Sequence, residues 1–279
     1  MFRIGRRQVI SKPKRKRFKY IYGPVSSWRL GRSLGIDPIS SNKKTCTFNC
    51  IYCQVGRATK FSKRRKIYVK TEKIIDEIKS LPHLKIDYIT FSGRGEPTLA
   101  KNLGALIKAI KKLRKEKIAV LTNSSLMNRQ DVRNELALAD FVVAKIDAPS
   151  DRLFNLIDKP MRDIKFGSII EGIKKFRRIY AGRLGLQIMF IDLNKKITIE
   201  WASIIEEIKP DEVQINTPTR PNKTAPLSKK EIVNIKNQFL KISSFRGNLV
   251  LVYDSCRKAV SPISTKHALK KRGRGIERL

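Results

Sequence analysis

The sequence predicts an α/β protein built on a parallel sheet. Short runs of β-branched and aromatic residues alternate along the chain with longer segments whose apolar residues recur at helical spacing. The chain has 279 residues, 41% of them hydrophobic, which is enough for one sizeable core. The alternation therefore favours βαβ units around that core. We expect them to form one domain, residues 20–255.

The expected elements follow from these patterns in chain order. Strands are expected where apolar runs lie between turn residues, at residues 30–36, 87–92, 118–122, 141–146, 184–191, 212–216 and 249–253. Helices are expected where an apolar stripe lies opposite lysines, at residues 71–80, 103–113, 131–138, 166–180, 198–208 and 228–242. Thr71 stands where the first helix needs an N-cap. No apolar run reaches the roughly 20 residues of a membrane span, so no membrane partner is expected.

The chain carries a large excess of positive charge. Its 61 Lys and Arg against 24 Asp and Glu give a net charge of +37. Residues 1–19 and 256–279 lack apolar periodicity and are expected to be basic arms; they supply 16 of the 37 charges, so the body keeps +21. Such an excess predicts a polyanionic partner, most simply RNA such as tRNA, held by its phosphates. Two alternatives stay open: a codon bias that leaves the charges solvated, and an organelle transit peptide at the Arg-rich start.

Three of the four cysteines gather in one short stretch, residues 44–57. Cys46 and Cys50 are separated by three residues, and Cys50 and Cys53 by two. Thiolates this close in sequence can turn toward one cubane iron–sulfur cluster and hold three of its irons. Ordinary electron-transfer clusters use four cysteines, so the fourth iron is left without a local ligand. The stretch therefore predicts a [4Fe–4S] cluster with one coordination position open to a small molecule.

Zinc binding, disulfide formation and electron transfer are alternative uses of these cysteines. A zinc site needs four ligands, usually in two pairs, and the remaining candidates Cys256, His83 and His267 show no paired spacing. A disulfide framework needs an oxidising compartment, and nothing in the sequence resembles a secretory signal, so we expect a cytoplasmic protein. Cys256 is either a small buried hydrophobe or a fourth cluster ligand. In the second case the protein would be an electron carrier. A further alternative is a basic RNA-binding protein with a structural metal centre.

The C-x3-C-x2-C spacing, with Tyr52 before the last cysteine, resembles the radical S-adenosylmethionine (radical SAM) superfamily. The resemblance implies that the open iron binds the amino and carboxylate groups of SAM, with Tyr52 lining the SAM site. It implies an electron donor of the flavodoxin or ferredoxin type, whose electron cleaves SAM to methionine and a 5′-deoxyadenosyl radical that abstracts hydrogen from a substrate. It also implies a partial (β/α)6 barrel, whereas the bare alternation fits a doubly wound sheet equally well.

The second predicted strand, residues 87–92, ends in the segment F-S-G-R-G-E-P-T-L at residues 91–99. Catalytic groups of parallel α/β folds collect at such carboxyl ends. By itself the segment is an ordinary glycine- and proline-rich turn. After the cysteine motif, it resembles the superfamily's G-G-E-P element, which implies that Gly93, Gly95 and Glu96 receive the methionine amino group. Arg94 departs from the small residue that is usual there.

Two later strand ends add candidate residues. Asn123 follows the third strand, where the resemblance implies contact with SAM; the alternative is that it caps a turn. Lys145 and Asp147 end the fourth strand and share one face of it, so they form either a pair inside the site or a surface ion pair. We favour the inward arrangement and a catalytic role. A lysine here is also a candidate for a Schiff base with a carbonyl substrate.

Arg220 stands between two prolines after the sixth strand, where a stiff loop suits contact with phosphate or carboxylate, although a plain surface loop is the alternative. The strings R-L-G-R-S-L-G at residues 29–35, K-I-D-A at 145–148 and T-P-T-R-P at 217–221 resemble the branch of wyosine-type tRNA synthases. That resemblance implies modification of tRNA. Archaeal wyosine synthases carry further cysteines for a second cluster, and this chain has only Cys256 to spare.

Overall fold

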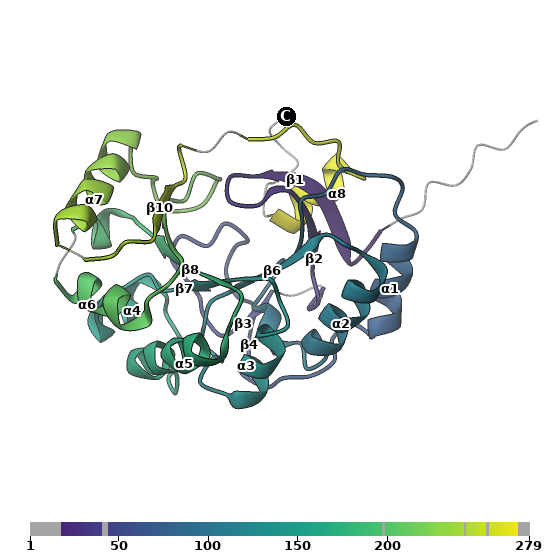
Figure 1. The fold of residues 1–279 in the computed structure, drawn as a ribbon, viewed down its shortest axis with the longest axis horizontal. Helices are drawn as coiled ribbons and strands as arrows, with labels where there is room; N and C mark the ends of the chain where they lie inside the picture. Colours follow the sequence, from purple (N-terminus) through teal and green to yellow (C-terminus); the bar gives the residue numbers. More distant parts are fainter. Residues whose placement is uncertain (1–17, 41–43, 197–198, 243, 255–256, 273–279) are drawn as a thin grey trace, which may run out of the picture.

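The computed structural model describes residues 18–40, 44–196, 199–242, 244–254 and 257–272. One eight-stranded sheet curls into a half-barrel, and helices lie along its outer side (Figure 1). In the order of the sheet, its strands are β1 (Ile21–Ser27), β2 (Gly31–Ile36), β5 (Tyr88–Phe91), β6 (Lys117–Thr122), β7 (Phe141–Lys145), β8 (Arg183–Met189), β9 (Glu212–Asn216) and β10 (Asn248–Leu251). β3 (Thr45–Cys46) and β4 (Lys60–Phe61) form a separate two-stranded sheet.

The strand order decides between the two predicted architectures. β1 is antiparallel to β2, and each later neighbour, from β2 to β10, is parallel and follows in chain order. Right-handed crossovers that always advance in one direction leave every connecting helix on the same face of the sheet. A doubly wound sheet would reverse its strand order and carry helices on both faces. The half-barrel is therefore confirmed, and the doubly wound alternative is excluded.

The helices pack on the sheet through the apolar stripes that the sequence shows. In α2 (Leu103–Leu113), for example, the buried residues include Leu103, Leu106, Ile107 and Ile110, which lie on one helical face. The remaining helices are α1 (Thr71–Lys79), α3 (Gln130–Leu136), α4 (Asp151–Ile157), α5 (Phe166–Ile179), α6 (Ile199–Ile208), α7 (Lys229–Ile242) and α8 (Thr265–Arg272), with short 3₁₀ turns η1 (Pro97–Leu99) and η2 (Asp192–Asn194). None of the helices in the described ranges has the length and apolar character that crossing a bilayer requires.

Each predicted strand and helix is present, with ends shifted by a few residues. The elements β1, β3, β4, α4 and α8 were not predicted. β1 forms a hairpin with β2, and its Tyr22 ring fills the place of a side chain at Gly35, where a Cβ would lie 2.1 Å from the ring. Gly35 thus allows the close approach of a neighbouring side chain. α4 begins after Ser150, whose hydroxyl accepts a hydrogen bond from the Leu153 N–H, and is only seven residues long.

Part of the predicted basic tail belongs to the folded body. Residues 265–272 form α8, which packs against β1 (Figure 1). Lys271 of α8 is 8% exposed and pairs with Asp37, which is 1% exposed, at 2.7 Å. Residues 1–17 and 273–279, which complete the predicted arms, lie outside the described residues.

The buried Lys271–Asp37 pair yields a prediction on stability. Lys271→Gln removes the cation and leaves the Asp37 carboxylate buried without its countercharge, which should lower the free energy of unfolding by about 3–5 kcal/mol. The measurement is urea denaturation of the purified protein. Lys270→Gln, at the exposed neighbouring position, is the control and should change little. Equal midpoints for the Lys271→Gln variant and the parent would contradict the assigned role of the pair.

Candidate active site

The cysteine loop, residues 44–57, lies against the carboxyl ends of the parallel strands. Backbone hydrogen bonds join it to two of the loops that follow these strands. Thr45 pairs with Gly95 in an isolated parallel bridge, and its carbonyl accepts a hydrogen bond from the Glu96 N–H at 3.3 Å. Further along, the Asn49 N–H donates to the Asp158 carbonyl at 3.0 Å. These backbone bonds hold the cysteine loop over the end of the half-barrel.

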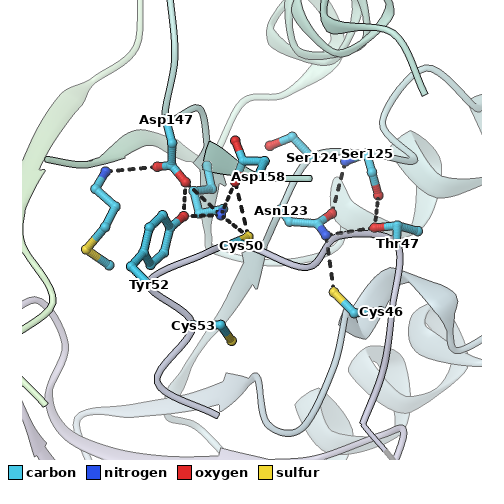
Figure 2. Close-up of polar contacts among 12 residues, drawn as sticks. Cys46, Thr47, Cys50, Tyr52, Cys53, Asn123, Ser124, Ser125, Asp147 and Asp158 are labelled. Atoms are coloured by element: carbon cyan, nitrogen blue, oxygen red, sulfur yellow. Dashed lines mark hydrogen bonds and ion pairs between the residues drawn. The ribbon is translucent and has the colours of Figure 1, made fainter. Parts of the chain in front are cut away.

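Each of the three cysteine sulfurs accepts a hydrogen bond from a nitrogen donor. Asn123 Nδ2 donates to Cys46 Sγ at 3.6 Å, Lys145 Nζ to Cys50 Sγ at 3.3 Å, and Lys44 Nζ to Cys53 Sγ at 2.9 Å. Figure 2 shows the three cysteine side chains around a common space. Donors and positive charges beside a sulfur favour its thiolate form, which is the form that binds metal.

The three thiols differ in how far neighbouring groups offset the effect of burial on their pKa values. Burial raises the pKa values of Cys46 and Cys50. Burial acts in the same direction on Cys53, but the charge of Lys44 and its hydrogen bond outweigh it, so the Cys53 pKa is lowered. Lys44 thus favours the thiolate of Cys53, whereas burial disfavours the thiolates of Cys46 and Cys50.

A cavity of about 340 Å³ opens beside the cysteine loop. Its wall contains all the candidate site residues except Asp147, namely Cys46, Cys50, Tyr52, Cys53, Gly93, Gly95, Glu96, Asn123, Lys145 and Arg220. Residues from the ends of several strands thus meet in one cavity, as the strand-end argument predicts. Arg94 is partly exposed and does not line the cavity.

Lys145 is the centre of a buried polar network. Its ammonium binds Asp147 at 2.7 Å and Asp158 at 3.0 Å, and also donates to the Tyr52 hydroxyl, which in turn donates to Asp147. Asp147 also accepts a hydrogen bond from the Met189 N–H at 2.8 Å, and Cys50 Sγ donates to Asp158 at 3.1 Å (Figure 2). Lys145 and Asp147 thus form a buried pair and not a surface ion pair.

The charge on Lys145 bears on its chemistry. Burial would lower its pKa, but the negative charges of Asp158 and Cys50 outweigh burial, and the pKa is raised. Burial and the neighbouring Asp158 raise the pKa of Asp147. A Schiff-base lysine needs a lowered pKa to supply a free amine. In this arrangement the carboxylate of Asp158 and the sulfur of Cys50 favour the charged form of Lys145.

Glu96 is held rigidly at the edge of the cavity. It is 2% exposed, and its Oε1 accepts hydrogen bonds from the hydroxyls of Thr98 and Thr122, both at 2.7 Å. Its Oε2 accepts the Asn123 N–H at 2.7 Å. Burial raises the Glu96 pKa, and these hydrogen bonds oppose the rise. The fixed carboxylate keeps acceptor capacity for a cationic group in the cavity.

Asn123 holds the cysteine loop as well as lining the cavity. Its Nδ2 donates to Thr47 Oγ1 at 2.8 Å in addition to Cys46, and its Oδ1 accepts the Ser125 N–H at 3.1 Å. Asn123 therefore both caps the turn that follows β6 and contacts Cys46. Ser124 follows with a φ of 68°, which turns the chain sharply after β6.

The two glycines after β5 allow neighbouring segments to approach. A Cβ at residue 95 would lie 2.0 Å from the Thr45 carbonyl oxygen, and one at residue 93 would lie 2.5 Å from the Asp37 carboxyl. Gly93 also has a φ of +138°, which side chains disfavour. Gly95 is thus needed for the cysteine loop to reach the strand ends.

Arg220 connects the cysteine loop to α8. Its Nε donates to Gln54 Oε1 at 2.6 Å, and its guanidinium also donates to the Arg272 carbonyl. The stiff loop predicted around Arg220 therefore carries a side chain that points to the cavity and not to bulk solvent.

The donor set fits an iron–sulfur cluster better than a single metal ion. Among the described residues, no three His, Cys, Asp or Glu side chains converge on a point that one ion would occupy. Thiolates around a cluster each bind a different iron, so they need to surround a volume and not a point. Cys256, the proposed alternative ligand, lies outside the described residues.

Residues 44–216 match the sequence profile of the Radical SAM superfamily. The chain belongs to the radical SAM superfamily. The matched range contains the three cysteines and all the candidate site residues except Arg220. The cofactors of the superfamily are a [4Fe–4S] cluster and SAM, and its members are enzymes.

Similar proteins extend the match beyond the cysteine motif. A UPF0026 protein of Synechocystis sp. is 43% identical over 205 residues, which cover 73% of this chain and 77% of that protein. A UPF0026 protein of Methanocaldococcus jannaschii is 33% identical over 268 residues, covering 89% and 83%. The structure of TYW1 with a lysine–pyruvate adduct bound superposes with a TM-score of 0.59 at 18% identity, covering 76% of this chain and 74% of that chain. At this identity the likeness to TYW1 concerns the fold.

Two residues around the cysteine loop were not predicted as part of the site. Asp158, 2% exposed, follows the unpredicted α4 and pairs with Lys145 and Cys50. Lys44, which donates to Cys53 and to the Gly56 carbonyl at 2.6 Å, stands at the start of the cysteine stretch. Neither residue has a sequence signal that separates it from the many other charges of the chain.

The contact between Gly95 and Thr45 yields a prediction on the cluster. Gly95→Ala forces the backbone of β3 away from the strand ends, so it should lower the free energy of unfolding by about 1–3 kcal/mol and reduce the iron retained after anaerobic reconstitution. Gly167→Ala is the matched control, because a Cβ at residue 167 would meet nothing within 4 Å. Unchanged iron content and stability in Gly95→Ala would show that the loop tolerates displacement.

Proposed function

We propose that Cys46, Cys50 and Cys53 hold three irons of a [4Fe–4S] cluster and that SAM binds the fourth in the adjoining cavity. The observation that carries this proposal is the ring of three sulfurs, each with its own nitrogen donor, on the wall of one cavity. When bound and reduced, the cluster and SAM supply a 5′-deoxyadenosyl radical that takes a hydrogen atom from a substrate.

The chain's own residues would place SAM and keep water out. The fixed Glu96 carboxylate is suited to accept hydrogen bonds from the methionine ammonium, beside the backbone of Gly93 and Gly95. Tyr52 presents an aromatic face to the cavity while its hydroxyl is held by Asp147. Asn123 positions Cys46 and borders the same space. Lys145 and Asp147 act as positioning residues for Cys50 and Tyr52.

We infer that the substrate is an RNA, with tRNA as the first candidate. The charge of the body alone, +21, is large for a chain of this size, and acidic residues are scarce. The fold likeness to TYW1 and the strings shared with the wyosine-type branch point in the same direction. An electron donor of the flavodoxin or ferredoxin type would supply the electron.

SAM cleavage is the direct test of the cluster assignment. After anaerobic reconstitution and reduction with dithionite, the protein should release 5′-deoxyadenosine, measured by chromatography. Cys50→Ala should abolish the product because it removes an iron ligand, whereas Cys256→Ala should keep both cluster and product. Loss of the cluster in Cys256→Ala would instead support the electron-carrier alternative.

The RNA proposal predicts a steep salt dependence. If tRNA is held through about six phosphates, its affinity should fall by roughly 10³-fold between 50 and 200 mM salt. Filter binding or fluorescence anisotropy measures this affinity. SAM affinity over the same salt range is the control and should stay nearly constant. A tRNA affinity that does not change with salt would count against phosphate recognition.

A further inference from the structure

Arg29, in the turn between β1 and β2, places a partly exposed cation on the cavity wall. Within the described part of the chain its guanidinium forms no hydrogen bond, and its buried Nε has no acceptor. The guanidinium instead stacks on Trp28, 4.4 Å from the ring centroid. Leaving a buried donor unpaired costs about 1–3 kcal/mol, and more when the group is charged. The buried Nε carries this cost, and an acceptor in the cavity would remove it.

Further positive charge surrounds Arg29. Burial, and then the charges of Arg220 and Arg272, lower the Arg29 pKa, while Glu212 opposes them. Glu212 is already engaged, because it pairs with Arg183 and accepts a hydrogen bond from Gln214. Arg257 lines the cavity as well. Like charges held close together in a partly enclosed space are stabilised by an anion between them.

The same hairpin supplies a second unpaired donor. The Ser26 hydroxyl, three residues before Arg29, is buried without a hydrogen-bond partner, and Ser26 also lines the cavity. A guanidinium together with a hydroxyl matches the oxygens of a carboxylate or a phosphate. A neutral ligand would satisfy the hydroxyl but would leave the charge of Arg29 uncompensated.

We propose that Ser26 and Arg29 form an oxyanion subsite for the substrate, on the β1–β2 hairpin. This subsite rests on the proposed function, because its oxyanion belongs to the substrate from which the radical takes a hydrogen atom. In an RNA substrate the oxyanion is a backbone phosphate, and in a small organic acid it is a carboxylate. The subsite would set the substrate's position relative to the cysteine loop across the same cavity.

Isothermal titration calorimetry of the full, cluster-loaded protein tests this subsite. Sodium phosphate and sodium acetate are titrated anaerobically at constant ionic strength. At least one of them should bind saturably, and Arg29→Gln should weaken that binding by roughly tenfold to a hundredfold. Stronger binding of phosphate supports the RNA source, and stronger binding of acetate supports a carboxylate. Arg178→Gln is the control variant, because it removes an exposed arginine of α5. It should bind phosphate and acetate with the same affinity as the parent protein.

Two results would overturn the subsite: no saturable binding of either anion by the parent, or equal affinity in Arg29→Gln. Ser26→Ala provides a second variant in case Arg29→Gln does not fold, as judged by circular dichroism. It should weaken binding severalfold, and unchanged affinity would again contradict the proposal. The titration needs neither SAM nor a reductant, so it separates failure of the subsite from failure of SAM cleavage.

Discussion

The arrangement of the site depends on the contacts that the ammonium group of Lys145 makes. From the end of β7 it joins Asp147, Asp158, Tyr52 and Cys50, which come from three separate segments. Charged groups buried in this way are costly unless each one is paired, so the pairing fixes where the segments lie relative to one another. The cysteine loop has little regular structure of its own, and this network replaces what a helix or strand would provide.

The half-barrel explains why such a network can form at all. Parallel strands advancing in one direction place all their carboxyl ends at one edge, and the loops that follow them are close in space although far apart in sequence. The cysteine loop reaches this edge because Gly95 leaves room for the Thr45 carbonyl. The β1–β2 hairpin and α8 add a basic wall to the same cavity, through Arg29, Lys271 and Arg272. The cavity wall thus carries three cysteine sulfurs together with several basic side chains.

The parallel strands and the gathering of the three cysteines were predictable because their signals are local. An apolar strand reads as a run of β-branched residues, and the three cysteines lie within one loop. The partners of the network were not predictable in this way. Cys50 and Asp158 are 108 residues apart, and the bond between them depends on α4, a helix too short to show periodicity. The inclusion of α8 in the body depends on Lys271 pairing with Asp37 across 234 residues, and in the sequence Lys271 is one of many lysines.

Electron paramagnetic resonance of the reduced, iron-loaded protein, recorded with and without SAM, tests the central claim most directly. If three cysteines hold the cluster and one iron is open, SAM must coordinate that iron and change the g-values of the spectrum. The signal should remain in Cys256→Ala and respond to SAM in the same way. Superimposable spectra with and without SAM, together with a signal that disappears in Cys256→Ala, would show that side chains fill every coordination position and would contradict the account.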